Sequence, residues 1–203
     1  MGSLTSAQDA ILIGSLLGDE TLRKQDNRKN ALLEVNHSYK QKEYVDWKFK
    51  NFEEFILTMP KSRKGKGSRT AYRFTTQSLP IFTEYYYKFY SLGKKHIPID
   101  LKLNSLSLAV WFMDDGAKSY SSFYLNTQQF SNSEQIFLLN LLKSTFGIIS
   151  KLNRDKQYYR LRIDGESSIK MKKIIEPHIL PSLKYKLIND PVTTELKNEI
   201  LIL

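Results

Sequence analysis

LIGSLLGDE at residues 12–20 and LAVWFMDDG at residues 108–116 are two stretches that share one pattern. Each is apolar or small at almost every position and ends in acid, with Asp19 in the first stretch and Asp115 in the second. A surface helix has a single apolar stripe, whereas a helix that is apolar on all sides is buried. The two stretches therefore predict two buried helices, each with a carboxylate at its C-terminal end.

The segments that follow the two stretches repeat one order of elements. Hydrophobic periodicity and turn residues predict helix, strand, strand, helix, strand, strand and helix, first before residue 98 and again after residue 104. The two acids are 115 − 19 = 96 residues apart, which fits the duplication of one unit. The sequence predicts an α+β protein with two pseudo-symmetric αββαββα halves and antiparallel sheets, at residues 7–97 and 105–190, with a linker at 98–104 and a tail at 191–203.

The composition narrows the chemistry. The chain has 31 Lys and Arg against 21 Asp and Glu, a net charge of +10, which favours a polyanionic partner, although charge that serves only solubility is the alternative. It has no cysteine and three widely separated histidines, so a metal would bind oxygen ligands, as Mg²⁺, Mn²⁺ and Ca²⁺ do. We expect no membrane partner and see no targeting peptide, so the protein is intracellular, is made inside an organelle, or has had its targeting segment removed. The first residues, Met1 to Ser3, resemble a cloning scar.

The two acids predict a metal site if the two helices pack against each other along a pseudo-twofold axis. Gly14, Gly18 and Ala109 are small enough for a close approach. A helix C-terminus carries partial negative charge, so two carboxylates there repel each other unless a cation intervenes. A divalent cation also lowers the pKa of bound water, which phosphodiester hydrolysis requires. For one acid alone, an ordinary turn residue is the alternative, and we interpret the neighbouring Glu20 and Asp114 as turn or solvent-facing groups.

Basic and amide side chains in and beside the predicted strands favour DNA readout by a sheet. Arg and Lys contact guanine edges and phosphates, and Asn and Gln contact adenine edges, whereas a merely solvated polar face is the alternative. The loop at residues 61–69 has five basic residues and no acid, and we expect it either to contact phosphates or to be a flexible linker. The candidate DNA-contacting residues are Arg23, Lys24, Arg28, Asn36, His37, Arg63, Lys64, Lys66, Arg69, Arg73, Gln77, Lys118, Asn126, Gln128, Lys151, Arg154, Arg160 and Arg162.

The two stretches resemble the two signature helices of LAGLIDADG homing endonucleases. The segments at residues 116–118, 124–128 and 179–187 are similar to the single-chain, omega-type enzymes of mitochondrial introns. The resemblance implies that the signature helices form the central interface of a monomer that acts as a pseudo-dimer. It also implies a site-specific enzyme, encoded in a mitochondrion or chloroplast, that makes double-strand breaks with 3′ overhangs in a long DNA target.

The resemblance also implies a role for each site residue. Asp19 and Asp115 would coordinate Mg²⁺ with the backbone carbonyls of Gly18 and Asp114; Mn²⁺ would substitute, and Ca²⁺ would support binding with little cleavage. The remaining matches are Lys95 and Lys186, as lysines that orient solvent or stabilise phosphorane charge, and Gln128 with its pseudo-symmetric counterpart His37, as polar residues that hold the active-site water network.

Two other functions stay open. The runner-up is a group I intron maturase, which would bind intron RNA through the same basic surface. A transcription factor built on an inactive nuclease fold is the other, and it predicts the loss of one acid. Both acids and both lysines are present in this chain, which favours the endonuclease.

Overall fold

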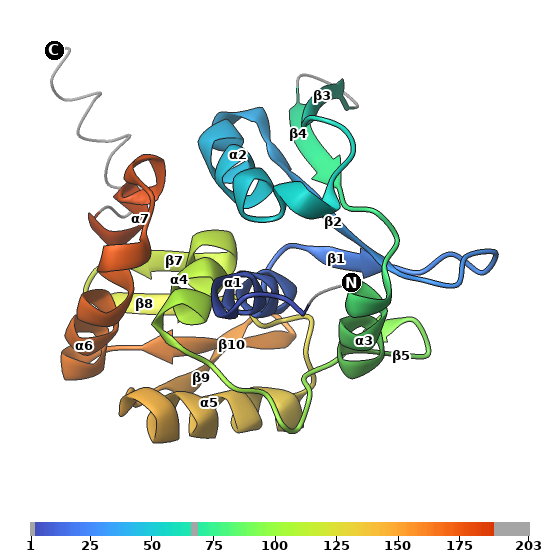
Figure 1. Ribbon diagram of the computed structural model, residues 1–203. Coiled ribbons are helices and arrows are strands. Elements are labelled where there is room, and N and C mark those ends of the chain that lie inside the picture. The colour runs from blue at the N-terminus through green and yellow to red at the C-terminus, as the bar shows by residue number, and fades with distance from the viewer. Residues whose placement is uncertain (1–2, 66–68, 189–203) are drawn as a thin grey trace, which may run out of the picture. The chain divides into compact units, whose positions relative to one another are not determined.

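The computed structural model describes residues 3–65 and 69–188, and the chain divides into two compact units between Leu101 and Lys102 (Figure 1). This division falls within the segment 98–104. Lys66 and the tail at 191–203, which figured in the sequence-based predictions, lie outside the described residues. Among the residues described, no helix is both long enough and apolar enough to cross a membrane.

The first unit has one antiparallel sheet whose strands lie in the order β1-β2-β4-β3. One face of this sheet is covered, because α1 packs on β1, α2 on β2 and β4, and α3 on β1 and β2. Its elements are α1 (Ser6–Leu17), β1 (Thr21–Arg23), β2 (Leu32–Ser38), η1 (Tyr39–Gln41), α2 (Lys42–Asn51), η2 (Glu53–Phe55), β3 (Lys61–Lys64), β4 (Thr70–Thr75), α3 (Pro80–Phe89) and the hairpin β5 (Tyr90–Ser91) and β6 (Lys94–Lys95).

The second unit repeats this plan with the strand order β7-β8-β10-β9. Helix α4 packs on β7 and β8, α5 on β9 and β10, and α6 on β8 (Figure 1). Its elements are α4 (Ser105–Asp115), β7 (Gly116–Ser119), β8 (Ser122–Leu125), α5 (Asn132–Phe146), β9 (Lys151–Asp155), β10 (Tyr158–Ile163), α6 (Gly165–Ile175), η3 (Glu176–His178), η4 (Pro181–Leu183) and α7 (Tyr185–Ile188).

The predicted αββαββα order and the antiparallel sheets are therefore confirmed in both units. One local expectation is wrong, because the first part of the basic loop at 61–69 is the strand β3. Ser62 pairs with Tyr72 and Arg63 with Ala71 on β4, so the ladder hydrogen bonds extend the sheet into a segment whose side chains are all exposed. Charge marks this segment as surface, but it does not distinguish a loop from an edge strand.

The two signature helices, α1 and α4, are buried as their sequences predict. Leu12, Leu16 and Leu17 have no exposed area on α1, and every side chain of α4 from Leu108 to Met113 is equally covered. Each helix starts with a capping box, from Thr5 and Gln8 on α1 and from Asn104 and Ser107 on α4. These reciprocal hydrogen bonds satisfy the first backbone N–H groups of a helix and fix where it begins.

Candidate active site and nucleic-acid interface

Asp19 follows the end of α1, where the chain turns sharply. The backbone N–H of Gly18 donates to the carbonyls of Gly14 (3.2 Å) and Ser15 (3.1 Å), which closes the last turn. The side chain of Asp19 is 51% exposed, whereas that of the next residue, Glu20, is fully buried. The turn therefore presents the Asp19 carboxylate to solvent and directs the Glu20 carboxylate into the unit.

Lys95 lies beside this turn. Its Nζ donates to the carbonyl oxygens of Gly18 (3.2 Å) and Glu20 (2.8 Å). The tight hairpin of β5 and β6, in which Leu92 and Gly93 have positive φ, brings the lysine back to the end of α1. A cation at this point satisfies carbonyls that have no partner within the helix and offsets the negative end of the helix dipole.

The second unit repeats this arrangement at the end of α4. Nζ of Lys186 donates to the carbonyls of Met113 (2.6 Å) and Asp114 (3.0 Å). In both units a lysine thus contacts the carbonyl that immediately precedes the candidate acid, Gly18 in one and Asp114 in the other. A carbonyl oxygen has two lone pairs, so it can accept from the lysine and also face a cation.

Asp115 is the last residue of α4, and its side chain is partly exposed. Its carbonyl accepts a hydrogen bond from the backbone N–H of Asn126 (3.1 Å), which ties the acid to the segment after β8. The amide of Gln128, two residues further on, donates to the Asp155 carboxylate (2.8 Å) at the end of β9. The water-holding role of Gln128 stays a prediction.

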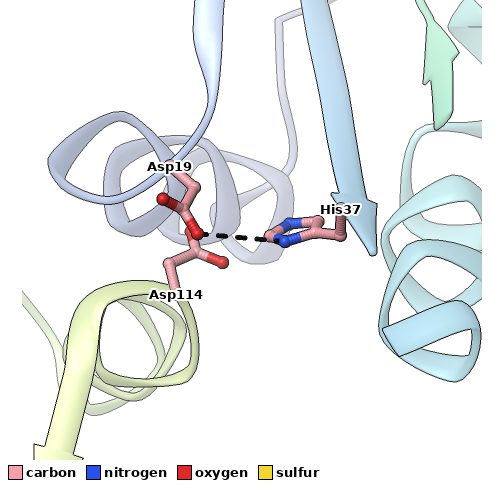
Figure 2. Close-up of side chains that lie close together, drawn as sticks. All are labelled: Asp19, His37 and Asp114. Carbon is pink, nitrogen blue, oxygen red and sulfur yellow. Dashed lines mark ion pairs between the residues drawn. The ribbon is translucent and has the colours of Figure 1, made fainter. Parts of the chain in front are cut away.

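His37 lies on β2 and faces the interior of the first unit. Its Nε2 is 2.7 Å from Oε1 of Glu20, and its Nδ1 faces Oδ2 of Asp19 at 3.9 Å (Figure 2). The imidazole is only 3% exposed, so the prediction that His37 contacts DNA is wrong. The pleat explains this: Asn36 points to the open face of the sheet, and its neighbour in sequence must point to the covered face.

Two further residues of this region have a different role from the one that the sequence suggested. Glu20 is neither a turn group nor solvent-facing, because its buried carboxylate accepts from both His37 and the Nζ of Lys48. Lys48 on α2 has no exposed area and was not among the candidates. Its signal in the sequence is its place four residues after Tyr44, on the helix face that the apolar spacing predicts to be buried.

The open face of the first sheet carries several of the predicted DNA-contacting residues. Asn36 pairs with Arg73, and Arg73 also pairs with Lys61, so the three share one face across three strands. Glu34 is the acid among them, and its carboxylate contacts Arg23 (2.7 Å) and Arg73 (3.6 Å). At the β3 end, a depression of about 470 Å³ is lined by Asn36, Arg63, Lys64, Gly65, Ala71 and Arg73.

The open face of the second sheet is built in the same way. Arg162 pairs with Tyr124 and with Lys151, and Arg160 packs its guanidinium 4.2 Å from the Tyr124 ring centroid and donates to Asn126 (3.4 Å). Stacking of this kind leaves a rigid guanidinium on the sheet surface. Lys151 and Arg162 also flank Asp164, and the hydrogen bond from Lys151 lowers the pKa of this carboxyl.

The remaining candidates lie around these faces, with two exceptions, Arg154 and Lys118. Arg154 pairs with Tyr159 and so points to the side opposite Arg160 and Arg162, where its Nε donates to the carbonyl of Lys156 (3.0 Å). The prediction that Arg154 contacts DNA with the open face is therefore not supported. Lys118 on β7 pairs with Phe123, whose side chain is buried, so it points to the side opposite Tyr124 and Arg162, and its contact with DNA through the open face is not supported either. Of the others, Lys24 and Arg28 follow β1, Arg69 precedes β4 and Gln77 follows β4.

Two units of one plan, each with a buried signature helix, a terminal acid beside a lysine and a basic open sheet, define the class of two-motif αββαββα proteins. The chain belongs to the LAGLIDADG DNA endonuclease family, which matches residues 9–171. The resemblance inferred from the two stretches is thereby confirmed.

Relatives and solved structures agree with this assignment. The chain is 30% identical over 200 residues to "Probable intron-encoded endonuclease 1" of Wickerhamomyces canadensis, which covers 92% of this chain and 86% of that protein. It is 32% identical over 192 residues to "Cytochrome b mRNA maturase bI2" of Debaryomyces hansenii, covering 88% and 72%. The structure of the homing endonuclease I-WcaI bound to its DNA recognition sequence superposes with a TM-score of 0.87 at 29% identity, covering 94% of this chain and 89% of that one. The structure of I-DmoI in complex with DNA and Ca, at 16% identity and a TM-score of 0.56, shares the fold over 95% of this chain and 98% of that one.

Proposed function

We propose that this chain is a site-specific homing endonuclease that hydrolyses both strands of a long DNA target and leaves 3′ overhangs. The observation that carries the proposal is the repeated arrangement at the ends of α1 and α4. In each unit a carboxylate, a carbonyl and a lysine lie together, with Lys95 in one and Lys186 in the other. A protein with the same fold but no cleavage activity would not need this arrangement in both units.

The donors at these two places fit a hard divalent cation. Asp19 and Asp115 supply carboxylate oxygens, and Gly18 and Asp114 supply carbonyl oxygens, which are the ligands that Mg²⁺, Mn²⁺ and Ca²⁺ prefer. A bound divalent cation would polarise the scissile phosphate and make a bound water more acidic. We take Mg²⁺ as the cofactor and Mn²⁺ as its substitute. Ca²⁺ would support binding with little cleavage, because it tolerates looser coordination.

The protein's own groups position the substrate and balance its charge. Lys95 and Lys186 place an ammonium beside each acid, where negative charge develops on the phosphorane during hydrolysis. Gln128, held by Asp155, would orient water in the second unit. The open sheet faces, with Arg73 and Arg162 among their cations, would contact phosphates and base edges of the duplex.

A maturase function on the same fold is the second candidate. It is supported by the Debaryomyces relative, which is named a cytochrome b mRNA maturase. The Wickerhamomyces relative is named as intron-encoded, which supports an origin of this chain in an intron. We take that intron to belong to a mitochondrial or chloroplast gene. Intron RNA would then be a further ligand of the basic surface.

A selection from a library tests the two functions together. A randomised DNA duplex library is incubated with the protein and Mg²⁺, and cut ends are sequenced; we expect one family of sites with 3′ overhangs. Binding to a transcribed group I intron is measured in parallel. A protein that cuts no library member but binds the structured RNA tightly is a maturase, and the endonuclease proposal is then overturned.

A further inference from the structure

A buried cluster of three ionisable side chains lies directly behind Asp19 in the first unit. Glu20 accepts from Nε2 of His37 (2.7 Å) and from Nζ of Lys48, and all three side chains are at most 3% exposed. Tyr44 covers two members of the cluster: its ring centroid lies 4.3 Å from Nζ of Lys48 and 5.3 Å from the His37 ring. The cluster joins the end of α1, the strand β2 and the helix α2.

The cluster determines how the imidazole is oriented. A carboxylate only accepts hydrogen bonds, so Nε2 of His37 must carry the proton that it shares with Glu20. In the neutral ring the acceptor nitrogen is then Nδ1, and this atom faces the Asp19 carboxylate at 3.9 Å (Figure 2). That separation is too long for a direct hydrogen bond.

The second unit has no such cluster among its described residues, 102–188. Gly116 follows Asp115 in the position that Glu20 has after Asp19, and a side chain there would overlap Phe112. A Cβ there would lie 2.2 Å from Cδ2 of Phe112 and 2.3 Å from its carbonyl oxygen. The buried polar contact between the strand end and α5 is neutral, from Thr127 to Gln135 (3.0 Å).

We propose that Glu20, whose charge is balanced by Lys48, is a positioning residue that fixes the His37 imidazole with Nδ1 toward Asp19, and that only the strand cleavage served by the first unit depends on it. This inference rests on the proposed endonuclease function. Its specific consequence is an asymmetry between the two strands, because within residues 3–65 and 69–188 this support is present in the first unit alone. A purely structural ion pair would affect both strand cleavages alike, through folding.

The test variants must avoid a buried charge without a partner, because removing one member of a buried pair is strongly destabilising. The double variant Glu20→Leu/Lys48→Met removes both charges and keeps their volume. His37→Phe removes both ring nitrogens and keeps a planar ring beside Tyr44, while Glu20 keeps Lys48 as its partner. The matched control is His178→Phe, because His178 is a half-buried histidine of the second unit that bonds Ser105 (2.9 Å) at the far end of α4 from Asp115.

The readout is strand-resolved cleavage of a supercoiled plasmid that carries the target recovered from the library, in Mg²⁺. We expect the double variant and His37→Phe to cut the same single strand about 10- to 100-fold more slowly. The other strand keeps its rate, so nicked circles accumulate, and His178→Phe linearises the plasmid like the wild type. Equal slowing of both strands, or of neither, overturns the inference while the endonuclease function stands. A wild type that cuts no site overturns the function itself.

A second readout does not depend on cleavage. Long-range ¹H–¹⁵N spectra of the metal-free protein report which imidazole nitrogen carries the proton. The wild type is expected to show His37 in the Nε2–H form alone, and the double variant to show an average of both forms. An averaged His37 in the wild type overturns the orientation, and circular dichroism melting confirms that each variant is folded.

Discussion

At the residue scale, the position after each acid shows how far the two units have diverged. In the first unit this residue is Glu20, which has a buried carboxylate. In the second unit it is Gly116, which has no side chain, and Phe112 occupies the space that a side chain would need. The same position in two copies of one pattern therefore serves two different packings. This explains why the second unit requires glycine after the acid, whereas the first unit has a buried glutamate there.

Gly116→Ala is expected to lower the free energy of unfolding by about 1–3 kcal/mol, because the new Cβ would overlap Phe112. Urea denaturation measures the change. The control is Gly165→Ala, where nothing lies within 4 Å of the new Cβ and the cost is confined to the positive φ of +57°, about 1 kcal/mol. A Gly116 variant no less stable than this control would show that Phe112 can move aside at little cost.

The acids and lysines of the site could be predicted from the sequence, but the buried cluster could not. Asp19 and Asp115 end two matched apolar stretches, and the resemblance supplies Lys95 and Lys186. His37, Glu20 and Lys48 meet because an alternation along β2, a turn after α1 and a face of α2 coincide in space. No spacing along the chain records that coincidence, and charged residues are ordinarily exposed.

At the element scale, the lysine at the end of each signature helix allows the contribution of each unit to be tested separately. Lys95→Met and Lys186→Met each remove an ammonium from one helix end and keep the length of the side chain. We expect each variant to slow a different strand by about 100-fold, because each loses charge stabilisation at one site. Strand-specific end labels measure this, and slowing of one and the same strand by both variants would be the contrary result.

A second prediction at this scale concerns the attachment of α3 to α1. The hydroxyl of Tyr85 donates to the carboxylate of Asp9, and burial, followed by this hydrogen bond, raises the pKa of Tyr85. Tyr85→Phe should therefore cost about 0.5–1.5 kcal/mol of stability in a thermal or urea melt. Tyr87→Phe is the matched control, because Tyr87 is 65% exposed and the loss of its hydroxyl should not change the stability. Equal stability of the two variants would mean that the Asp9 contact contributes nothing.

Strands that have a buried face can be predicted from the sequence, whereas the exposed and charged strand β3 cannot. The segment Thr70–Thr75 alternates buried and outward residues from Tyr72 on, which is the pattern that predicts a strand with one covered face. Lys61–Lys64 is exposed throughout, so no hydrophobic alternation marks it, and only its pairing with β4 makes it a strand. Sequence patterns report burial, and an edge strand without a buried face leaves no such pattern.

At the scale of the whole molecule, the proposed function rests on the duplication of one αββαββα unit. A net charge of +10 and two basic open sheets favour a polyanionic partner. In the proposed function, the two acid–lysine sites would act on one strand of the duplex each. The repeat could be predicted because the two matched stretches of sequence are separated by a period of 96 residues. The buried contacts next to the two acids differ between the units, and they could not be predicted because they arise from packing within each unit.

The most direct test compares Asp19→Asn and Asp115→Asn with the exposed control Asp100→Asn on the recovered DNA target. Linearisation of the plasmid is timed in Mg²⁺, and affinity is measured in Ca²⁺. Both site variants should bind as the wild type does and linearise the plasmid about 100-fold more slowly or not at all, while the control keeps the full rate. Linearisation at the wild-type rate by either site variant would contradict the assignment of these two acids to the cleavage site.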